Sequence, residues 1–208
     1  MKIFCDLDGT LIDVAIRHYR VYSETIHEFN GTPLGQTKYW ELKRNKAKWS
    51  FLLPLSGVAS ESENKFLERF KDKIENPEYL KLDTLFPNVV MTLEKLRELG
   101  DCYLVTLRRN RKNVLEELDY LDLSHQFTEV LTGHSESDGY DVKISLIRDK
   151  LDDAEGIIIG DTEADIITGK ELGLRTFAVR TGIRDDTFLK QLHPDHIISE
   201  FADVTRYI

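Results

Sequence analysis

Four aspartates stand in two pairs, each directly after a short apolar run, and this placement suggests a metal-assisted site. Asp6 and Asp8 follow an apolar run at the N-terminus, and Asp161 and Asp165 follow a run of isoleucines. Because ligands bind where the strands of an open parallel sheet end, the two pairs can meet in one pocket. Four carboxylates would repel one another there unless a hard cation lay between them, and a set of oxygen ligands suits Mg²⁺.

The elements that must position these aspartates follow from the apolar pattern. Short runs typical of strands buried on both faces occupy residues 2–6, 101–106, 156–160 and 175–180. Helical patterns lie at residues 89–99, 114–121, 144–151 and 166–172, and weaker strands are expected near residues 130–131 and 197–198. This alternation predicts an α/β fold, a Rossmann-like parallel sheet flanked by helices.

The segment of residues 14–84 has a different texture. It shows no convincing strand, and helical patterns cover residues 14–29, 38–52 and 61–74. We therefore expect two domains, a Rossmann-like catalytic core of residues 1–13 and 85–208 and an inserted helical cap of residues 14–84.

The order of the motifs resembles that of a known family. The run Asp6-Leu7-Asp8-Gly9-Thr10 is similar to the signature of the haloacid dehalogenase-like (HAD) phosphatases, and Thr106, Lys143 and residues 160–165 follow in the family's order. The resemblance covers the whole predicted core. The insertion matches the type-1 helical cap of phosphoglycolate phosphatase-like members in its position only.

The resemblance implies a Mg²⁺-dependent phosphoric monoester hydrolase. Asp6 would be the nucleophile that forms an aspartyl-phosphate, and Asp8 the general acid and base. Asp6, the backbone carbonyl of Asp8 and Asp161 would bind Mg²⁺, and Asp165 would help through water or by orienting the metal.

Three further residues would contact the phosphoryl group or the substrate. The resemblance implies that Thr106 donates its hydroxyl to a phosphoryl oxygen and that Lys143 neutralises charge on the nucleophile. Ile144 follows Lys143 where the family often has proline, so Lys150 is the alternative lysine. Arg108 is either a substrate contact or a surface residue.

Each of these residues taken singly has an ordinary explanation. An aspartate at a strand end is usually a helix N-cap or turn residue, Thr106 could be a core hydroxyl, and Lys143 a solvated lysine. The joint pattern favours function, since capping needs neither the two acidic pairs nor a matching threonine and lysine. In the cap, residues 38–48 carry five cations against one anion, flanked by Trp40 and Trp49. That stretch is either an anion-binding patch or an amphipathic helix with core tryptophans.

The overall composition argues against some classes of binding partner and cellular location. The chain has 208 residues and a formal net charge of −9, which argues against non-specific binding to nucleic acid or anionic membranes. No apolar stretch approaches the roughly 20 residues of a membrane span, and no signal peptide is expected. If the first two core strands end together at Asp6 and Thr106, Cys5 lies near Val105, out of disulfide reach of Cys102. We expect a reduced, cytoplasmic protein, a monomer or weak dimer.

The predicted activity is hydrolysis of a small phosphorylated metabolite, with phosphoglycolate suggested by analogy. The nearest alternative is a phosphomutase that returns the phosphoryl group to a sugar. A non-catalytic binding protein on the same fold is another, and a nucleic-acid 3′-phosphatase is disfavoured by the negative charge.

Overall fold

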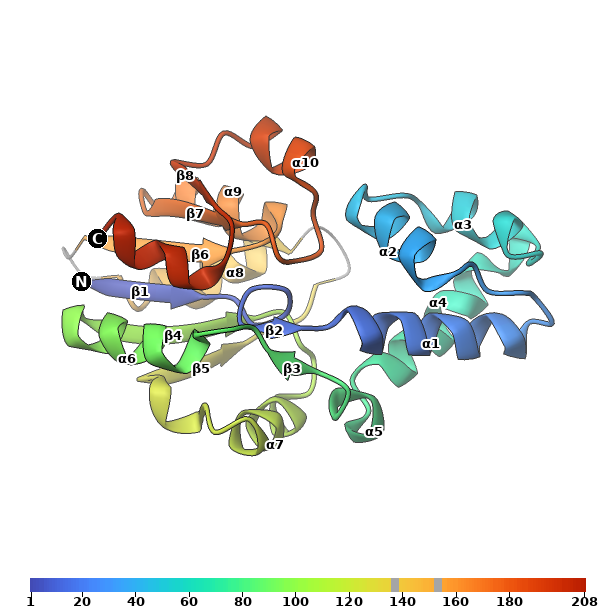
Figure 1. Ribbon diagram of the computed structural model, residues 1–208, viewed down its shortest axis with the longest axis horizontal. Coiled ribbons are helices and arrows are strands. Elements are labelled where there is room, and N and C mark those ends of the chain that lie inside the picture. Colours follow the sequence, from blue (N-terminus) through green and yellow to red (C-terminus); the bar gives the residue numbers. More distant parts are fainter. Residues whose placement is uncertain (136–138, 152–154) are drawn as a thin grey trace. The chain divides into compact units, whose positions relative to one another are not determined.

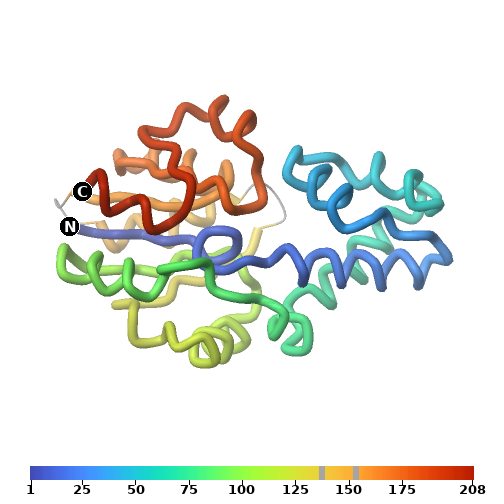
Figure 2. The backbone as a smooth tube through the Cα atoms, viewed as in Figure 1, coloured from blue at the N-terminus to red at the C-terminus, as the bar shows by residue number. Residues whose placement is uncertain are grey.

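The computed structural model describes residues 1–135, 139–151 and 155–208. Contacts divide the chain into two compact units, Met1–Asp13 with Thr84–Ile208, and Val14–Asp83. The first unit is hereafter called the core and the second the insertion. Figure 2 lets the reader follow the chain from the first strand into the insertion and back into the core.

A parallel sheet of six strands forms the centre of the core, in the order β5-β4-β1-β6-β7-β8. Its strands are β1 (Lys2–Cys5), β4 (Asp101–Thr106), β5 (Glu129–Thr132), β6 (Gly156–Gly160), β7 (Arg175–Val179) and β8 (His196–Ile198). Helices lie on both faces (Figure 1): α6 (Val89–Leu99), α7 (Arg111–Tyr120), α8 (Tyr140–Arg148), α9 (Glu163–Glu171) and α10 (Asp186–Gln191). Two 3₁₀ turns, η2 (Ser124–Gln126) and η3 (Phe201–Arg206), complete the unit. The predicted α/β fold is confirmed.

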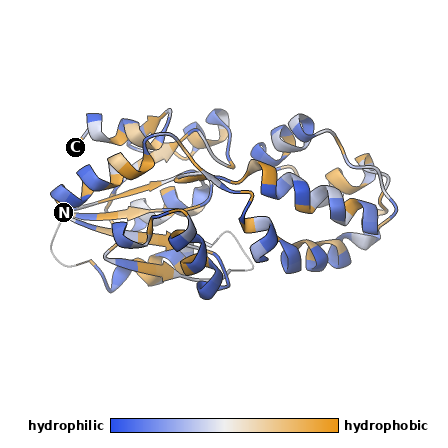
Figure 3. Cartoon of the chain, turned by 60° about the horizontal axis from the view of Figure 1, so that its bottom comes forward, coloured by the Kyte–Doolittle hydropathy of each residue, from blue (hydrophilic) through white to orange (hydrophobic). Residues whose placement is uncertain are grey.

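Burial on both faces explains the continuous apolar runs of these strands. Successive side chains of a strand point to opposite faces, and Ile3, Phe4 and Cys5 of β1 are all fully buried. Phe4 packs in a cluster with Ile158 of β6 and Ile147 of α8. Figure 3 shows the hydrophobic colour concentrated along the strands and on the inner sides of the helices.

The register of β1 against β4 differs from the expectation by one residue. Cys5 lies opposite Leu104, and Ile3 lies opposite Cys102. The expected alignment of Asp6 with Thr106 is therefore wrong, because Asp6 follows the residue opposite Leu104, and β4 continues through Val105 to Thr106. Both cysteines are buried and free.

A short antiparallel pair stands where the chain leaves and re-enters the core. Strand β2 (Ile12–Asp13) pairs with β3 (Thr84–Leu85). The sequence pattern did not reveal this pair, since two residues per strand are too few to show a period. It brings the two connections to the insertion side by side.

The insertion is entirely helical in secondary structure. Its elements are α1 (Ala15–Glu28), α2 (Gln36–Arg44), α3 (Trp49–Leu55), η1 (Ser60–Ser62), α4 (Glu63–Ile74) and α5 (Pro77–Leu80). The single helix expected over residues 38–52 is wrong. It is split into α2 and α3 around Lys46, whose φ of 54° lies in the left-handed region that a continuing helix does not allow.

Aromatic packing and one buried ion pair hold the insertion together. Tyr22 and Tyr39 stack with ring centroids 4.1 Å apart, and Trp49 packs 4.9 Å from Phe66. Arg17, in the first helix, pairs with Asp83, the last residue of the insertion, at 3.1 Å, and both side chains are buried. The pair ties the two ends of the segment to each other.

Candidate active site

The site forms at the carboxyl end of β1, where the order in which successive strands join the sheet reverses. Strands β4 and β5 extend the sheet on one side of β1, and β6, β7 and β8 extend it on the other. Strand β1 is central, with β4 on one side and β6 on the other. In such sheets the carboxyl ends of the strands on either side of the reversal open a crevice for ligands. Asp6 directly follows β1 at this point, and its N–H donates to the carbonyl of Ile159 at 2.9 Å. Because β1 and β6 are parallel neighbours, Asp6 and Asp161 follow adjacent strand ends at the same edge of the sheet, as the sequence led us to expect.

Three carboxylates lie together at this edge. Asp6, Asp161 and Asp165 are all buried, and one oxygen of each lies within 4.8 Å of the others. The ammonium of Lys143 joins two of them, with Nζ 2.6 Å from Asp6 Oδ1 and 2.5 Å from Asp165 Oδ1. Only 2% of the Lys143 side chain is exposed, so these are desolvated, charge-assisted hydrogen bonds.

The electrostatics of this cluster follow from burial. Burial raises the pKa of Asp6 from its ordinary 3.8 to about 7; Lys143 lowers it, and the neighbouring carboxylate of Asp165 raises it. Burial and the charges of Asp6 and Asp165 also raise the pKa of Asp161 well above its usual range. Burial acts to lower the pKa of Lys143, but the two carboxylates outweigh it and the pKa is raised. The cluster therefore carries more acid than its lysine can neutralise.

Asp8 is held in a separate ion pair. Arg108 donates from Nε to Asp8 Oδ2 at 2.8 Å and from a terminal nitrogen to Oδ1 at 2.5 Å. Its other terminal nitrogen donates to Glu117 Oε2 at 2.8 Å. Arg108 is 4% exposed, which is at odds with the interpretation of it as an ordinary surface residue. The planar guanidinium thus bridges the strand-end aspartate to helix α7.

Asp165 both caps helix α9 and binds Lys143. Its Oδ2 accepts from the N–H of Thr162 at 3.1 Å and from the Thr162 hydroxyl at 2.7 Å, which closes a capping box at the start of α9. Its other oxygen accepts from Lys143. A helix cap therefore fixes the carboxylate that holds the lysine beside Asp6.

The described residues fit a small divalent cation. The donors of the cluster are carboxylate oxygens only, which suits Mg²⁺. The backbone approaches closely here: Gly9 has φ of 79°, and a Cβ on it would lie 2.5 Å from Asp161 Oδ2. The carboxylate of Asp8 is not part of this side-chain cluster, and the part of its backbone carbonyl in metal binding stays a prediction.

A comparison with known proteins decides the family. The family model described as haloacid dehalogenase-like hydrolase matches residues 3–179. The chain belongs to the haloacid dehalogenase-like hydrolases. The predicted family and enzyme class, a hydrolase of the HAD phosphatase type, are thereby confirmed.

Curated relatives of this hydrolase extend over nearly the whole chain. The pyrophosphatase PpaX of Oceanobacillus iheyensis is 26% identical and covers 97% of this chain and 94% of its own. The phosphoglycolate phosphatase of Rhodobacter capsulatus is 26% identical and covers 86% of this chain and 84% of its own.

Solved structures show the same fold. A haloacid dehalogenase-like family protein from Streptococcus pneumoniae has a TM-score of 0.76 at 21% identity, covering 99% of this chain and 97% of that one. A predicted phosphoglycolate phosphatase from Haemophilus somnus has a TM-score of 0.78 at 22% identity, covering 98% and 96%. In the described part of the hydrolase, no helix has the length and apolar character to cross a membrane.

Thr106 ends strand β4 and is 2% exposed. Its carbonyl accepts the N–H of Gly133 at 3.0 Å, which ties the end of β4 to the turn after β5. The role of its hydroxyl stays a prediction.

Several residues near the aspartates were not predicted. Glu117 holds Arg108 from helix α7, Thr10 donates its hydroxyl towards Asp161 Oδ1 at 3.5 Å, and the segment of residues 181–184 contacts both acidic loops. Thr10 lies within the first motif, but no role was predicted for it, and no motif marks Glu117 or residues 181–184.

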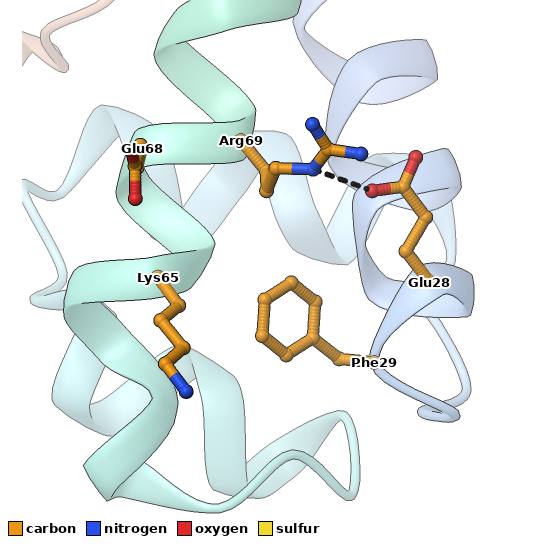
Figure 4. Close-up of a pocket in the computed structure, with 5 residues that line it drawn as sticks. All are labelled: Glu28, Phe29, Lys65, Glu68 and Arg69. Carbon is orange, nitrogen blue, oxygen red and sulfur yellow. Dashed lines mark ion pairs between the residues drawn. The ribbon is translucent and has the colours of Figure 1, made fainter.

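The insertion has a pocket of its own, which differs in character from the acid cluster. It has a volume of about 520 Å³ and is lined by Glu28, Phe29, Lys65, Glu68 and Arg69 (Figure 4). Arg69 Nε lies 3.4 Å from Glu28 Oε2, and both side chains are more than a third exposed. Its lining carries side chains of both charges rather than the carboxylates alone that form the acid cluster.

Trp40 and Trp49 pack against the aromatic core of the insertion. This packing favours the interpretation of residues 38–48 as part of that core's helical cover over the interpretation as an anion-binding patch.

Proposed function

We propose that this chain is a Mg²⁺-dependent phosphatase that hydrolyses a small phosphate monoester through an aspartyl-phosphate on Asp6. The observation that carries the proposal is the buried arrangement of Asp6, Asp161 and Asp165 around Lys143, at the sheet edge where Asp8 follows Asp6 by two residues. When bound, Mg²⁺ would be held by Asp6, Asp161 and the carbonyl of Asp8, and it would offset the charge of the carboxylates and of the phosphoryl oxygens.

The chain's own residues perform the remaining steps. A carboxylate oxygen of Asp6 attacks phosphorus, the bond to the leaving oxygen breaks, and Asp8 gives that oxygen a proton. Asp8 then takes a proton from a water molecule, the resulting hydroxide attacks phosphorus, and the bond to Asp6 breaks. Lys143 lowers the pKa of Asp6 against the effect of burial and so favours the anionic form that attacks, and the hydroxyl of Thr106 orients the phosphoryl group.

Arg108 has a place in this sequence of steps. It occupies both oxygens of Asp8 in the structure, so it must exchange that contact before Asp8 reaches a leaving group. An anionic substrate would draw the guanidinium to itself, while Glu117 retains the other end. The names of the relatives suggest two substrates with a second anionic group, the monoester phosphoglycolate and, as an alternative to a monoester, the phosphoanhydride pyrophosphate. The helical insertion would be the cap that admits these small molecules.

The test is phosphate release from an aryl phosphate, phosphoglycolate and pyrophosphate, with Mg²⁺ and with EDTA. We expect turnover that requires Mg²⁺ and that falls by several orders of magnitude in Asp6→Asn. Asp101→Asn is the matched control, because Asp101 is half-exposed at the opposite end of strand β4 and pairs with Lys2. Turnover that survives Asp6→Asn, or a folded protein that binds no Mg²⁺, would reject the proposal.

A further inference from the structure

The segment of residues 181–184, which follows strand β7, contacts one of the carboxylates of the proposed metal site. The N–H of Ile183 donates to Asp161 Oδ2 at 2.5 Å, and the hydroxyl of Thr181 donates to the carbonyl of Gly9 at 2.8 Å. A Cβ on Gly182 would lie 2.0 Å from Asp161 Oδ2, so only glycine allows this approach. The segment therefore contacts both acidic loops through its backbone and one hydroxyl.

One ion pair fixes the end of this segment. Arg184 donates from Nε to Glu163 Oε2 at 2.7 Å and from a terminal nitrogen to Oε1 at 2.9 Å. The two side chains are only 14% and 7% exposed. A bidentate guanidinium–carboxylate pair sets orientation as well as distance. Since Glu163 is the first residue of α9 and lies two residues after Asp161, the pair joins the segment to the loop that carries Asp161.

The consequence for Asp161 is a fixed rotation of its carboxylate. Thr10 reaches one oxygen and the N–H of Ile183 the other. Groups that orient a metal ligand without touching the metal commonly change metal affinity by 10–100-fold when they are removed. An ion pair that served the fold alone would change unfolding and leave that affinity unaltered.

We propose that Glu163 and Arg184 are positioning residues of the metal site, which hold the N–H of Ile183 against Asp161 and so set the affinity of the cluster for Mg²⁺. The inference rests on the proposed Mg²⁺-dependent function. It gives a role to Glu163, a motif residue to which the sequence analysis gave none, and adds Arg184, which lies outside the four motifs; neither belongs to the acid cluster itself.

The experiment measures Mg²⁺ binding by isothermal titration calorimetry for wild type, Glu163→Gln, Arg184→Gln and the double variant. We expect each single variant to raise the Kd by at least about tenfold. The double variant should be no weaker than the weaker single variant, because both substitutions break one pair. Arg184→Lys keeps the positive charge but loses the paired hydrogen bonds of the guanidinium, so its Kd for Mg²⁺ should lie between those of wild type and Arg184→Gln.

A neighbouring pair supplies the control. Arg180 and Asp186 lie 2.6 Å apart in the same region, but both are about 40% exposed, so Arg180→Gln should leave the Kd unchanged. At saturating Mg²⁺ the kcat of Glu163→Gln should return to within about threefold of wild type, because excess metal offsets the weaker affinity.

The outcomes separate this inference from the proposed function. If the wild type binds Mg²⁺ and turns over while the variants keep its Kd within twofold, the positioning role is rejected and the phosphatase proposal stands. A wild type that binds no Mg²⁺ overturns both.

Discussion

Replacing Lys143 by methionine tests whether the acid cluster depends on a buried cation. Methionine keeps the length and the apolar stem of lysine but removes the ammonium, which lies 2.6 Å from Asp6 and 2.5 Å from Asp165. Removing one partner of a buried ion pair costs about 3–5 kcal/mol, because the remaining charge is left buried without compensation. We expect Lys143→Met to lower the free energy of unfolding by this amount in EDTA at pH 8.

The loss should depend on pH and on Mg²⁺. Even with Lys143 present, burial raises the pKa of Asp6 to about 7. Since Lys143 lowers that pKa, its removal should raise the pKa of Asp6 further. At pH 5 the folded variant can neutralise the carboxyl by protonation, so its deficit should be smaller than at pH 8. A bound Mg²⁺ ion would also offset the uncompensated charge and reduce the deficit at pH 8.

The measurement is urea unfolding of both proteins at pH 5 and pH 8, in EDTA and in excess Mg²⁺. Lys150→Met is the matched control: Lys150 pairs with Glu129 at 2.7 Å, but the two side chains are 30% and 44% exposed, so its loss should cost less than about 1 kcal/mol. A deficit below about 1 kcal/mol for Lys143→Met at pH 8 in EDTA would refute the reasoning.

Two further predictions concern the same edge of the sheet. In EDTA, the contribution of Asp6 to the free energy of unfolding should fall by up to about 1.4 kcal/mol per pH unit between about pH 4 and pH 7. Folded Asp6, with a pKa of about 7, retains a proton that the unfolded chain has lost. Urea unfolding of wild type and Asp6→Asn across this range isolates this contribution, and Mg²⁺ should reduce it. Glu117→Gln should destabilise the protein by about 1–3 kcal/mol by weakening a buried bond to Arg108, whereas Glu116→Gln, at an exposed pair, should change thermal unfolding little.

The sequence predicted the sheet and the acid cluster for a single physical reason. Apolar runs that end in aspartate place these residues at strand ends, and a parallel sheet brings those ends to one edge. The choice between Lys143 and Lys150 could be argued only by spacing. In the structure Lys143 lies within the cluster, while Lys150 pairs with Glu129. The fold could thus be predicted closely, but the break near Lys46 depends on a backbone conformation that no apolar period signals.

The residues that support the site could not be found in the same way. Glu117 accepts a hydrogen bond from Arg108 and lies in helix α7. Arg184 donates to Glu163 of helix α9 and lies in the loop after strand β7. Each pair depends on where a loop directs its side chains, and charged residues near loops are common enough that none stands out.

Two buried cations, Lys143 and Arg108, each lie between two carboxylates, and this bears on how the aspartates of the proposed mechanism are held. Lys143 lies between Asp6 and Asp165, and Arg108 between Asp8 and Glu117. In each case one carboxylate belongs to the proposed chemistry, while the other is anchored on a helix. A cation bonded only to the carboxylate of the proposed mechanism could move with an arriving phosphate. The carboxylate on the helix opposes this movement, because it would be left buried without a compensating charge. Asp165 and Glu117 therefore differ from Asp6 and Asp8 in what they supply: they hold the positive charge where a phosphoryl group must arrive, and the catalytic pair remains free to exchange partners.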